Sequence, residues 1–320
     1  MRVFVFLLSL ILLAGCSNDA GFSMPEQQQE FSSTLYNNKV DIIWLVDESS
    51  SMKKHQEKLS NEVEAMVQKL NELKLDYRMV MTTTSVGPGN SGGTYFGQPA
   101  VLTSTSPSLV ATLKGRLLRG EMGSDNERGI LSLQNLLSDS YVNGDGRGFH
   151  RPESLLLINV LSDEDDGTDG TRESVVQTLS NRLNVLKKPY RPGVGGWLLN
   201  FIGVIDNHCQ DQFGRVNLGL RYMDLVQLSG GRKFSICAGN LKPAVEGLQS
   251  RVLEILTDYP IAQIPNVATI RVYKNGILVP RSATNGWDYI PTLNVIRFYG
   301  SAVPAADSAI RVEFTPASAS

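Results

Sequence analysis

The seven residues Leu155–Leu161 constrain the fold more than any other part of the chain, because nearly every one of them is apolar. A strand with one face in water alternates apolar and polar residues, whereas a strand buried on both faces has no need to alternate. Strands of that second kind belong to parallel sheets that are covered by helices. Residues 40–46 have the composition of a second buried strand, and residues 197–205 predict a third strand.

Helical patterns separate the predicted strands. Apolar residues recur at helical spacing between Leu59 and Leu73, which predicts a long amphipathic helix over about residues 52–75. Further strands are predicted at residues 77–83 and 233–236, and further helices at residues 106–118, 126–137, 173–186, 222–228 and 243–256. This alternation predicts an α/β fold, namely a doubly wound, mostly parallel sheet flanked by helices, with binding sites at the carboxyl ends of its strands.

The pattern changes at Tyr259-Pro260, where the alternation of strands and helices ends. Beyond this point apolar and polar residues alternate, and Asn275-Gly276 is a strong hairpin turn signal. Short strands are predicted at Ile277–Val279, Val295–Phe298 and Ile310–Phe314. We therefore predict a main α/β domain over residues 39–257 and a small antiparallel, β-sandwich-like domain over residues 258–320.

The N-terminus has the features of an export signal. Arg2 is followed by an apolar run over residues 3–13, which is too short for a comfortable membrane span. Residues 13–16, Leu-Ala-Gly-Cys, resemble a bacterial lipobox, which implies that residues 1–15 are a lipoprotein signal peptide and that Cys16 becomes the lipidated first residue. An ordinary signal peptide with an unrelated cysteine is the alternative.

Several acyl chains on Cys16 would anchor the protein stably, because each buried CH₂ contributes about 0.8 kcal/mol. Ser17 is not the aspartate that signals inner-membrane retention, so the resemblance favours the outer membrane. Residues 16–38 have almost no apolar periodicity and are predicted to be a polar tether. The formal charge of −2 does not suggest nucleic acid as a partner, and without a second long apolar segment we expect membrane contact through the lipid only.

Cys209 and Cys237 are the two remaining cysteines. In an oxidising, exported compartment two such cysteines are most simply a disulfide. A pair of free buried thiols is the alternative.

Small residues that carry oxygen follow the predicted strand at residues 40–46. Asp47, Ser49 and Ser51 occupy alternate positions in the next loop, where two hydroxyls can turn toward one point. Hydroxyl and carboxylate oxygens suit Mg²⁺ or Mn²⁺, and Ca²⁺ is a further candidate. This segment predicts a metal site.

A second group of acids follows the central strand, because Leu155–Leu161 leads directly into Ser162 and then Asp163, Glu164, Asp165 and Asp166. Four consecutive acids repel one another unless a cation is near. For the last three acids, a solvated loop is the favoured alternative.

The loop at Asp47, with its Asp-x-Ser-x-Ser pattern between a buried strand and a long helix, resembles the metal-ion-dependent adhesion site (MIDAS) of von Willebrand factor type A (VWA) domains. The resemblance covers about residues 39–256 and extends to Gly230-Gly231 before the last strand. It implies a Rossmann-like VWA fold. It also assigns Asp163 to the family's aspartate at the end of the central strand.

The family places a threonine or serine in the loop before a later helix. Ser124, five residues before Gly129, is the residue in register, and it departs from the more usual threonine. Asp125 is the alternative source of this ligand. The resemblance thus implies a metal site formed by Asp47, Ser49, Ser51, Ser124 and Asp163.

In VWA domains the hydroxyls bind the metal directly and the aspartates act largely through water, so a partner's carboxylate can complete the metal shell. The resemblance implies a non-enzymatic, lipid-anchored adhesion or binding protein of the bacterial cell envelope that recognises an acidic group on a protein or glycan. A structural envelope-assembly lipoprotein with incidental metal binding is one alternative. A hydrolase that uses Ser91 or the metal is another, although His55, His150 and His208 do not occur in the sequence context of a serine-protease triad.

Overall fold

The computed structural model describes residues 26–31, 38–124, 126–190, 194–213 and 217–317. The predicted signal peptide at residues 1–15, the lipidation site Cys16 and the alternative ligand Asp125 lie outside these ranges. Among the residues that are described, no helix has both the length and the apolar character needed to cross a membrane.

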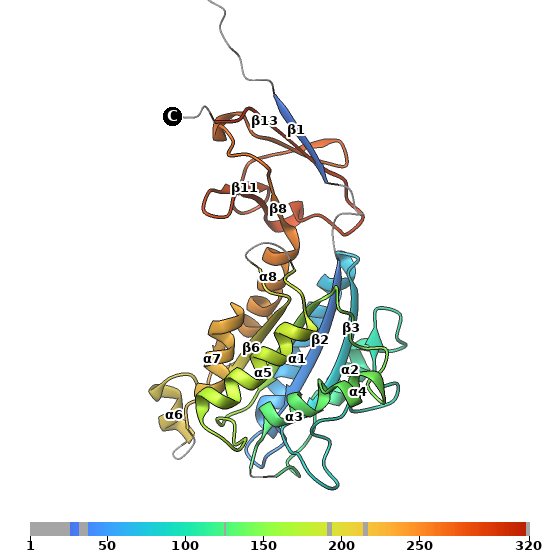
Figure 1. Ribbon diagram of the computed structural model, residues 1–320, viewed down its shortest axis with the longest axis vertical. Coiled ribbons are helices and arrows are strands. Elements are labelled where there is room, and N and C mark those ends of the chain that lie inside the picture. Colours follow the sequence, from blue (N-terminus) through green and yellow to red (C-terminus); the bar gives the residue numbers. More distant parts are fainter. Residues whose placement is uncertain (1–25, 32–37, 125, 191–193, 214–216, 318–320) are drawn as a thin grey trace, which may run out of the picture.

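A six-stranded sheet forms the centre of the main domain (Figure 1). Its strands are β2 (Lys39–Val46), β3 (Asp76–Thr83), β4 (Leu102–Thr103), β5 (Leu155–Leu161), β6 (Trp197–Gly203) and β7 (Lys233–Ser235). They lie in the order β4-β3-β2-β5-β6-β7, and all neighbours are parallel except the short β4. This is the order of a doubly wound fold, in which the direction of winding reverses between β2 and β5. The predicted fold class is confirmed.

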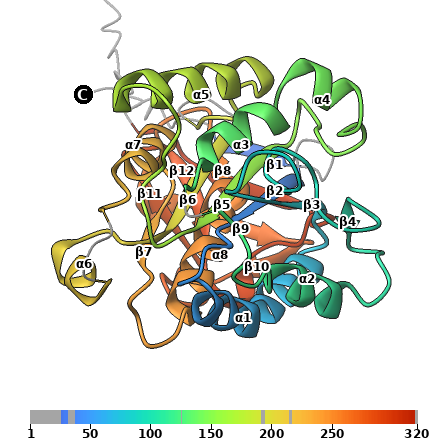
Figure 2. The ribbon, with the colours of Figure 1, turned by 90° about the horizontal axis from the view of Figure 1, so that it is seen from below.

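Helices cover both faces of this sheet, as the view along the strands shows (Figure 2). One face packs against α1 (Lys53–Glu72), α2 (Leu109–Leu117) and α8 (Lys242–Thr257). The other packs against α3 (Gly129–Leu136), α5 (Arg172–Leu186) and α7 (Leu220–Ser229). Two short helices, α4 (Asp139–Asn143) and α6 (Asn207–Phe213), complete the domain.

The continuous apolar character of the central strands follows from these two helical layers. In β2, Ile42 and Trp44 enter the core with α1, whereas Ile43 and Leu45 enter the core with α3 and α5. Successive side chains of a strand point to opposite faces, so both sets must be apolar when both faces are buried.

The remaining strands form two antiparallel sheets with a core of their own at one end of the main domain (Figure 1). One sheet has the order β1-β13-β9-β10, with β1 (Gln27–Phe31), β13 (Ile310–Phe314), β9 (Arg271–Lys274) and β10 (Ile277–Val279). The other has the order β11-β12-β8, with β11 (Trp287–Ile290), β12 (Val295–Phe298) and β8 (Asp258–Pro260). Asn275 and Gly276, with φ of 52° and 80°, turn β9 into β10 as a hairpin with positive φ at both central positions.

The prediction of a tether over residues 16–38 is wrong for Gln27–Phe31. These five residues form β1 and pair with β13. Backbone hydrogen bonds hold a strand in a ladder whatever its side chains, and β1 lies at the edge of its sheet, where polar residues are normal. Apolar periodicity therefore gave no signal for it. The sequence also did not indicate β4, α4, α6, β8 and β11.

The small module contacts the main domain at the amino ends of the central strands. Ala306 N donates a hydrogen bond of 2.9 Å to Leu73 O, just after α1, and Lys74 forms an ion pair with Asp307. Asn38 Nδ2 donates to Lys74 O at 3.2 Å, so the start of β2 lies at the same junction. The carboxyl ends of the strands are at the opposite end of the sheet.

A buried charge network also lies at the amino ends of β2 and β5. Asp41 is 0% exposed and accepts hydrogen bonds from Arg151 Nε at 2.9 Å and from Lys187 Nζ at 3.2 Å. The Lys187 side chain is fully buried, and its ammonium also donates to Ser154 Oγ at 2.8 Å. Arg151 also pairs with the half-exposed Asp76 at 2.6 Å, whereas Asp41 is the acid that the described structure places beside the buried Lys187.

Cys209 and Cys237 form a disulfide, as predicted. It joins α6 to the segment that follows β7.

Candidate metal centre

The predicted site residues Asp47 and Asp163 lie side by side at the point where the winding of the sheet reverses. Asp47 follows the last residue of β2, and Asp163 follows β5 after one intervening residue. Asp47 N donates to Leu161 O at 2.9 Å, which extends the pairing of the two strands into the loops. A crevice outside the carboxyl ends of strands at such a reversal is the usual ligand site of doubly wound folds.

The first loop directs two hydroxyl groups toward one point. Asp47 Oδ1 accepts from Ser49 N at 2.8 Å, so the carboxylate holds the loop from behind. Ser49 Oγ and Ser51 Oγ are 3.4 Å apart. Neighbouring ligands of an octahedral Mg²⁺ at 2.0–2.1 Å are about 3 Å apart, so a small shift would let both hydroxyls bind one ion.

Two residues that the sequence did not indicate hold this loop in place. Ser162 Oγ donates to Asp47 Oδ2 at 2.7 Å. Gln56, on α1, donates from Nε2 to Asp47 O at 2.8 Å and accepts from Gly120 N at 2.9 Å. Gln56 is buried, and it links the first loop to the loop that carries Ser124. Ser162 adjoins the acidic run, whereas nothing in the helical pattern distinguishes Gln56.

The Ser124 loop is packed directly against the first loop. Gly123 N donates to Glu48 O at 2.8 Å, and a Cβ on Gly123 would lie 2.4 Å from Glu48 Cγ. Only glycine therefore fits at this position. Ser124 N donates to Ser85 Oγ at 2.9 Å, and Ser124 Oγ accepts from Asn126 N at 3.1 Å.

Ser124 is therefore brought to the same group of loops as the other predicted ligands. In the described ranges, no hydrogen bond joins its hydroxyl to Asp47, Ser49, Ser51 or Asp163. Its role as a ligand stays a prediction.

Asp163 is the strongest sign that a cation belongs here. It is 0% exposed, and within the described part of the protein neither of its carboxylate oxygens has a hydrogen-bond partner. Buried polar groups are nearly always paired, and an isolated buried charge is very costly. Burial raises the pKa of Asp163, and the Ser51 hydroxyl, which is near the carboxylate but outside hydrogen-bond geometry, and the charge of Lys54 offset this only in part.

The charged form of Asp47 is disfavoured for the same reason. Burial raises its pKa to about 7, with a further increase from the charge of Asp163, although hydrogen bonds from Ser162 and Ser49 lower it. Two adjacent buried carboxyls beside two hydroxyls fit a hard divalent cation such as Mg²⁺ or Mn²⁺. No three His, Cys, Asp or Glu side chains in the described ranges converge on one point, so a metal here would depend on the hydroxyl oxygens.

The last two acids of the run have structural roles. Asp165 Oδ1 accepts from Arg221 N at 2.9 Å at the start of α7, and Asp166 Oδ2 accepts from Ile130 N at 2.8 Å at the start of α3. Carboxylates are favourable at helix N-termini because free N–H groups and the positive end of the helix dipole meet there. The interpretation of these two residues as a solvated loop is wrong. Glu164 is partly buried.

Glu127 is a further acid at this end of the sheet that the sequence did not indicate. It lies two residues before α3 and is 2% exposed. Burial, followed by the charge of Asp47, raises its pKa.

The metal-free protein is expected to gain stability as the pH falls from 8 to 6.5. Asp47, with a pKa of about 7 when folded and 3.8 as the ordinary value, binds a proton in this window that the unfolded chain has released. Stability falls with rising pH wherever the folded state binds more protons, and Asp47 alone contributes on the order of 1 kcal/mol. The raised pKa of Glu127 acts in the same direction.

Thermal unfolding followed by circular dichroism in EDTA at the two pH values checks this. Burial lowers the pKa of His55 and His150 from 6.5 to about 4, so these histidines increasingly oppose the effect as the pH approaches 6.5, and the range stops there. The net gain across the range therefore depends on Glu127 as well as on Asp47. Saturating Mn²⁺ should displace the protons and remove the effect. A metal-free protein that melts at a higher temperature at pH 8 than at pH 6.5 would contradict this account.

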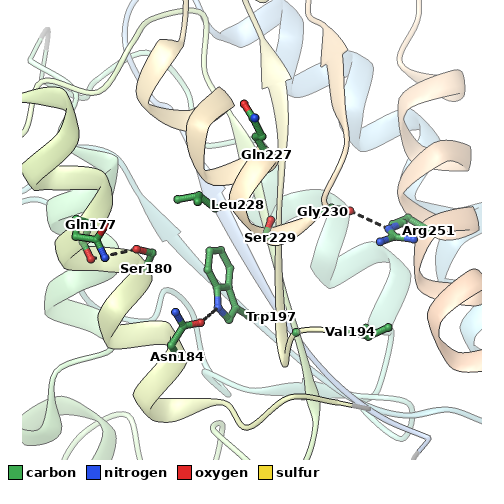
Figure 3. Close-up of a pocket in the computed structure, with 11 residues that line it drawn as sticks. Gln177, Ser180, Asn184, Val194, Trp197, Gln227, Leu228, Ser229, Gly230 and Arg251 are labelled. Carbon is green, nitrogen blue, oxygen red and sulfur yellow. Dashed lines mark hydrogen bonds between the residues drawn. The ribbon is translucent and has the colours of Figure 1, made fainter. Parts of the chain in front are cut away.

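A separate cavity of about 450 Å³ lies between α5, α7 and α8 (Figure 3). The amides of Gln177, Asn184 and Gln227 line it, and Trp197 Nε1 donates to Asn184 Oδ1 at 2.8 Å. Trp197 is the first residue of β6, so this cavity lies toward the amino ends of the strands. It is not part of the metal centre.

Neither a family model nor a curated protein matches the chain. Among solved structures, the pilus adhesin SpaC from Lactobacillus rhamnosus GG in its open conformation is similar, with 12% identity, a TM-score of 0.47 and coverage of 86% of this chain. The chain spans only 38% of the length of that adhesin.

Two further solved structures are similar over the larger part of the chain. Proximal thread matrix protein 1 from the mussel byssus, with a zinc-occupied MIDAS motif, has 12% identity and a TM-score of 0.42, with coverage of 71% of this chain and 50% of that chain. The conserved hypothetical protein BatB from Bacteroides thetaiotaomicron has 15% identity and a TM-score of 0.40, with coverage of 68% and 98%. All three TM-scores are below 0.5, so the nature of the site rests on its own contacts.

Proposed function

We propose that this protein is a metal-dependent binding protein of the bacterial cell envelope. Its ligand is a protein or glycan that supplies a carboxylate to a Mg²⁺ or Mn²⁺ ion held by Asp47, Ser49, Ser51 and Asp163, with Ser124 as a further ligand. The observation that carries the proposal is the unpartnered, buried carboxylate of Asp163 beside Asp47 and the two hydroxyls. The role proposed is recognition without catalysis.

The chemistry of the donor set supports a partner's carboxylate. Neutral hydroxyls give a metal ion little negative charge, so an ion bound mainly through Ser49 and Ser51 remains a strong acceptor for an anionic oxygen. Ser51 is exposed, so the ion would be accessible from outside. Met122, which is 93% exposed close to Ser124 in the chain, offers an apolar contact on the same loop.

The anchor is part of the same proposal. Lipid on Cys16 would attach the chain to the outer membrane, and no other membrane contact is proposed. The junction with the small module is at the amino ends of the central strands, so that module and the metal centre lie at opposite ends of the main domain.

A structural role in envelope assembly is the second candidate, and β10 favours it. This strand is at the edge of its sheet, with Ile277 73% and Leu278 58% exposed. Unpaired backbone groups beside exposed apolar side chains form a surface to which another chain can pair. Partner binding that persists in EDTA would favour this role.

Asp163→Asn tests the metal centre. We expect the variant to bind Mn²⁺ at least 10–100-fold more weakly, by titration calorimetry or by electron paramagnetic resonance of free Mn²⁺, because a neutral amide replaces a buried carboxylate. Asp163 accepts no hydrogen bond from the described protein, so the change should leave the metal-free protein as stable as before, or more so. Asp169→Asn, an exposed aspartate in the same connection, is the matched control.

Binding to the ligand class is tested with immobilised peptides that carry glutamate, against the same peptides with glutamine. The wild type should retain only the glutamate peptides, and only with Mg²⁺ or Mn²⁺. Equal Mn²⁺ affinity in the wild type and Asp163→Asn would overturn the metal centre. Metal binding without any preference for carboxylates would overturn the ligand class alone.

A further inference from the structure

Glu127 occupies a position that a glutamate rarely takes. It is 2% exposed, and among the described residues its Oε1 has no hydrogen-bond partner. Glutamate is almost never fully buried unless it is paired. Its position is well defined, because Glu127 O accepts from Gly167 N at 2.6 Å and the next residue, Arg128, donates from its backbone N to Thr84 O at 3.0 Å.

The groups that face Glu127 are also acidic. Its carboxyl lies within hydrogen-bond reach of Glu164, and it interacts with the charge of Asp47. Two facing carboxyls need a proton or a cation between them or beside them. Glu127 therefore belongs, with Asp47 and Asp163, to a group of buried acids whose negative charge no ion pair within the described residues compensates.

Two buried hydroxyls with no partner in the described structure border the same space. Thr84 Oγ1 and Tyr222 OH are both 0% exposed and unpartnered. A Cβ on Gly129 would lie 2.3 Å from Tyr222 OH and 3.3 Å from Thr84 Cγ2, so both residues lie against the start of α3, two residues after Glu127. Burial, and then the charges of acids that include Asp47 and Glu127, raise the pKa of Tyr222, so Tyr222 lies close to the acidic group.

We propose that Glu127 is a third carboxylate of the metal centre, linked to the ion through water held between Asp47, Thr84 and Tyr222. This inference rests on the proposed metal site, and it adds a residue that the Asp-x-Ser-x-Ser resemblance did not assign. A water bridge fits because unpartnered donors and acceptors surround Glu127, and buried water typically makes about three such hydrogen bonds. Through that water, the charge of Glu127 would help Asp47 and Asp163 to retain a divalent ion before any partner arrives.

The decisive variant is Glu127→Gln in the full chain, because it keeps the shape of the side chain and removes its charge. We expect Mn²⁺ to bind about 10–100-fold more weakly, which is the effect expected for a group that acts through a metal's outer shell. Metal-free stability should stay equal or rise, since an uncompensated buried carboxylate is removed. Relaxation of water protons by bound Mn²⁺ should change as well, because the bridging water is lost or loosened.

Glu48→Gln is the matched control. Glu48 is also buried in these loops, at 6% exposed, but Arg119 Nε and Nη2 donate to its carboxylate at 3.3 and 3.2 Å. Its charge is already compensated, so its Mn²⁺ affinity should stay within about 3-fold of the wild type. Tyr222→Phe provides a second test that leaves Glu127 intact, and it should weaken Mn²⁺ binding less than Glu127→Gln does.

The outcomes separate the two proposals. If the wild type and Asp163→Asn bind Mn²⁺ equally or not at all, the metal centre itself is wrong. If Asp163→Asn loses Mn²⁺ while Glu127→Gln and Tyr222→Phe bind it like the wild type, the role of Glu127 is overturned and the metal centre stands. A Glu48→Gln variant as weak as Glu127→Gln would also overturn it, because the effect would then be general to the loops.

Discussion

Replacing Asp41 with alanine should lower the free energy of unfolding by about 3–5 kcal/mol, the cost of breaking a buried ion pair by removal of one partner. Asp41 is the acid that balances Arg151 and Lys187, and the Lys187 side chain is fully buried. Without Asp41, Lys187 remains in the interior with only neutral partners among the described residues, and Arg151 keeps only the half-exposed Asp76. The penalty arises from those uncompensated charges more than from the lost hydrogen bonds.

Urea unfolding of Asp41→Ala beside Glu153→Ala measures this. Glu153 pairs with Lys39 at 2.7 Å near the same end of the sheet, but both side chains are largely exposed, and such surface pairs contribute about 0–1 kcal/mol. We expect only the Asp41 variant to shift the midpoint strongly. Similar small shifts in both variants would show that water reaches the network and that Lys187 is not buried in solution.

Removing the disulfide should cost about 3–4 kcal/mol on the chain-entropy model. Cys209 and Cys237 are separated by 28 residues, and the link restricts this long segment in the unfolded chain. The segment contains α7 and β7, so the crosslink restricts the part of the unfolded chain that forms the β7 edge of the main sheet.

The double variant Cys209→Ser/Cys237→Ser, unfolded in urea with and without a reductant, tests this prediction. The wild type should lose stability on reduction, whereas the variant should match the reduced wild type under both conditions. Equal midpoints for the oxidised and reduced wild type would show that the crosslink does not restrict the unfolded chain.

The main domain could be predicted closely from sequence because its physical requirements are local and strong. A strand such as Leu155–Leu161 must be apolar on both sides when helices cover both faces, and a helix such as α1 must show one apolar stripe. These periodicities are visible in any window of the chain. The ends of the helices were less accurate, as at α3, where the predicted start at residue 126 precedes Gly129 by three positions.

The candidate site could be predicted only where its residues follow strands directly. Asp47 and Asp163 were indicated because each comes just after a buried strand, and the reversal of the sheet brings the two together. Gln56 and Glu127 were not indicated by the sequence, because Gln56 reaches the site from α1 and Glu127 reaches it from the residues just before α3. Their burial depends on packing between distant segments, which has no signature in the local sequence.

The pairing of β1 with β13 has a consequence for the order of assembly. The two strands come from opposite ends of the described chain, and every element of the main domain lies between them. While the polypeptide is being made, β1 emerges early and stays without its neighbour until Ile310–Phe314 has followed. The main domain can fold in the meantime, and once folded it holds the start of β2 beside the end of α1, where the small module makes its contact. It thereby acts as a template that shortens the search of the last strand for the first.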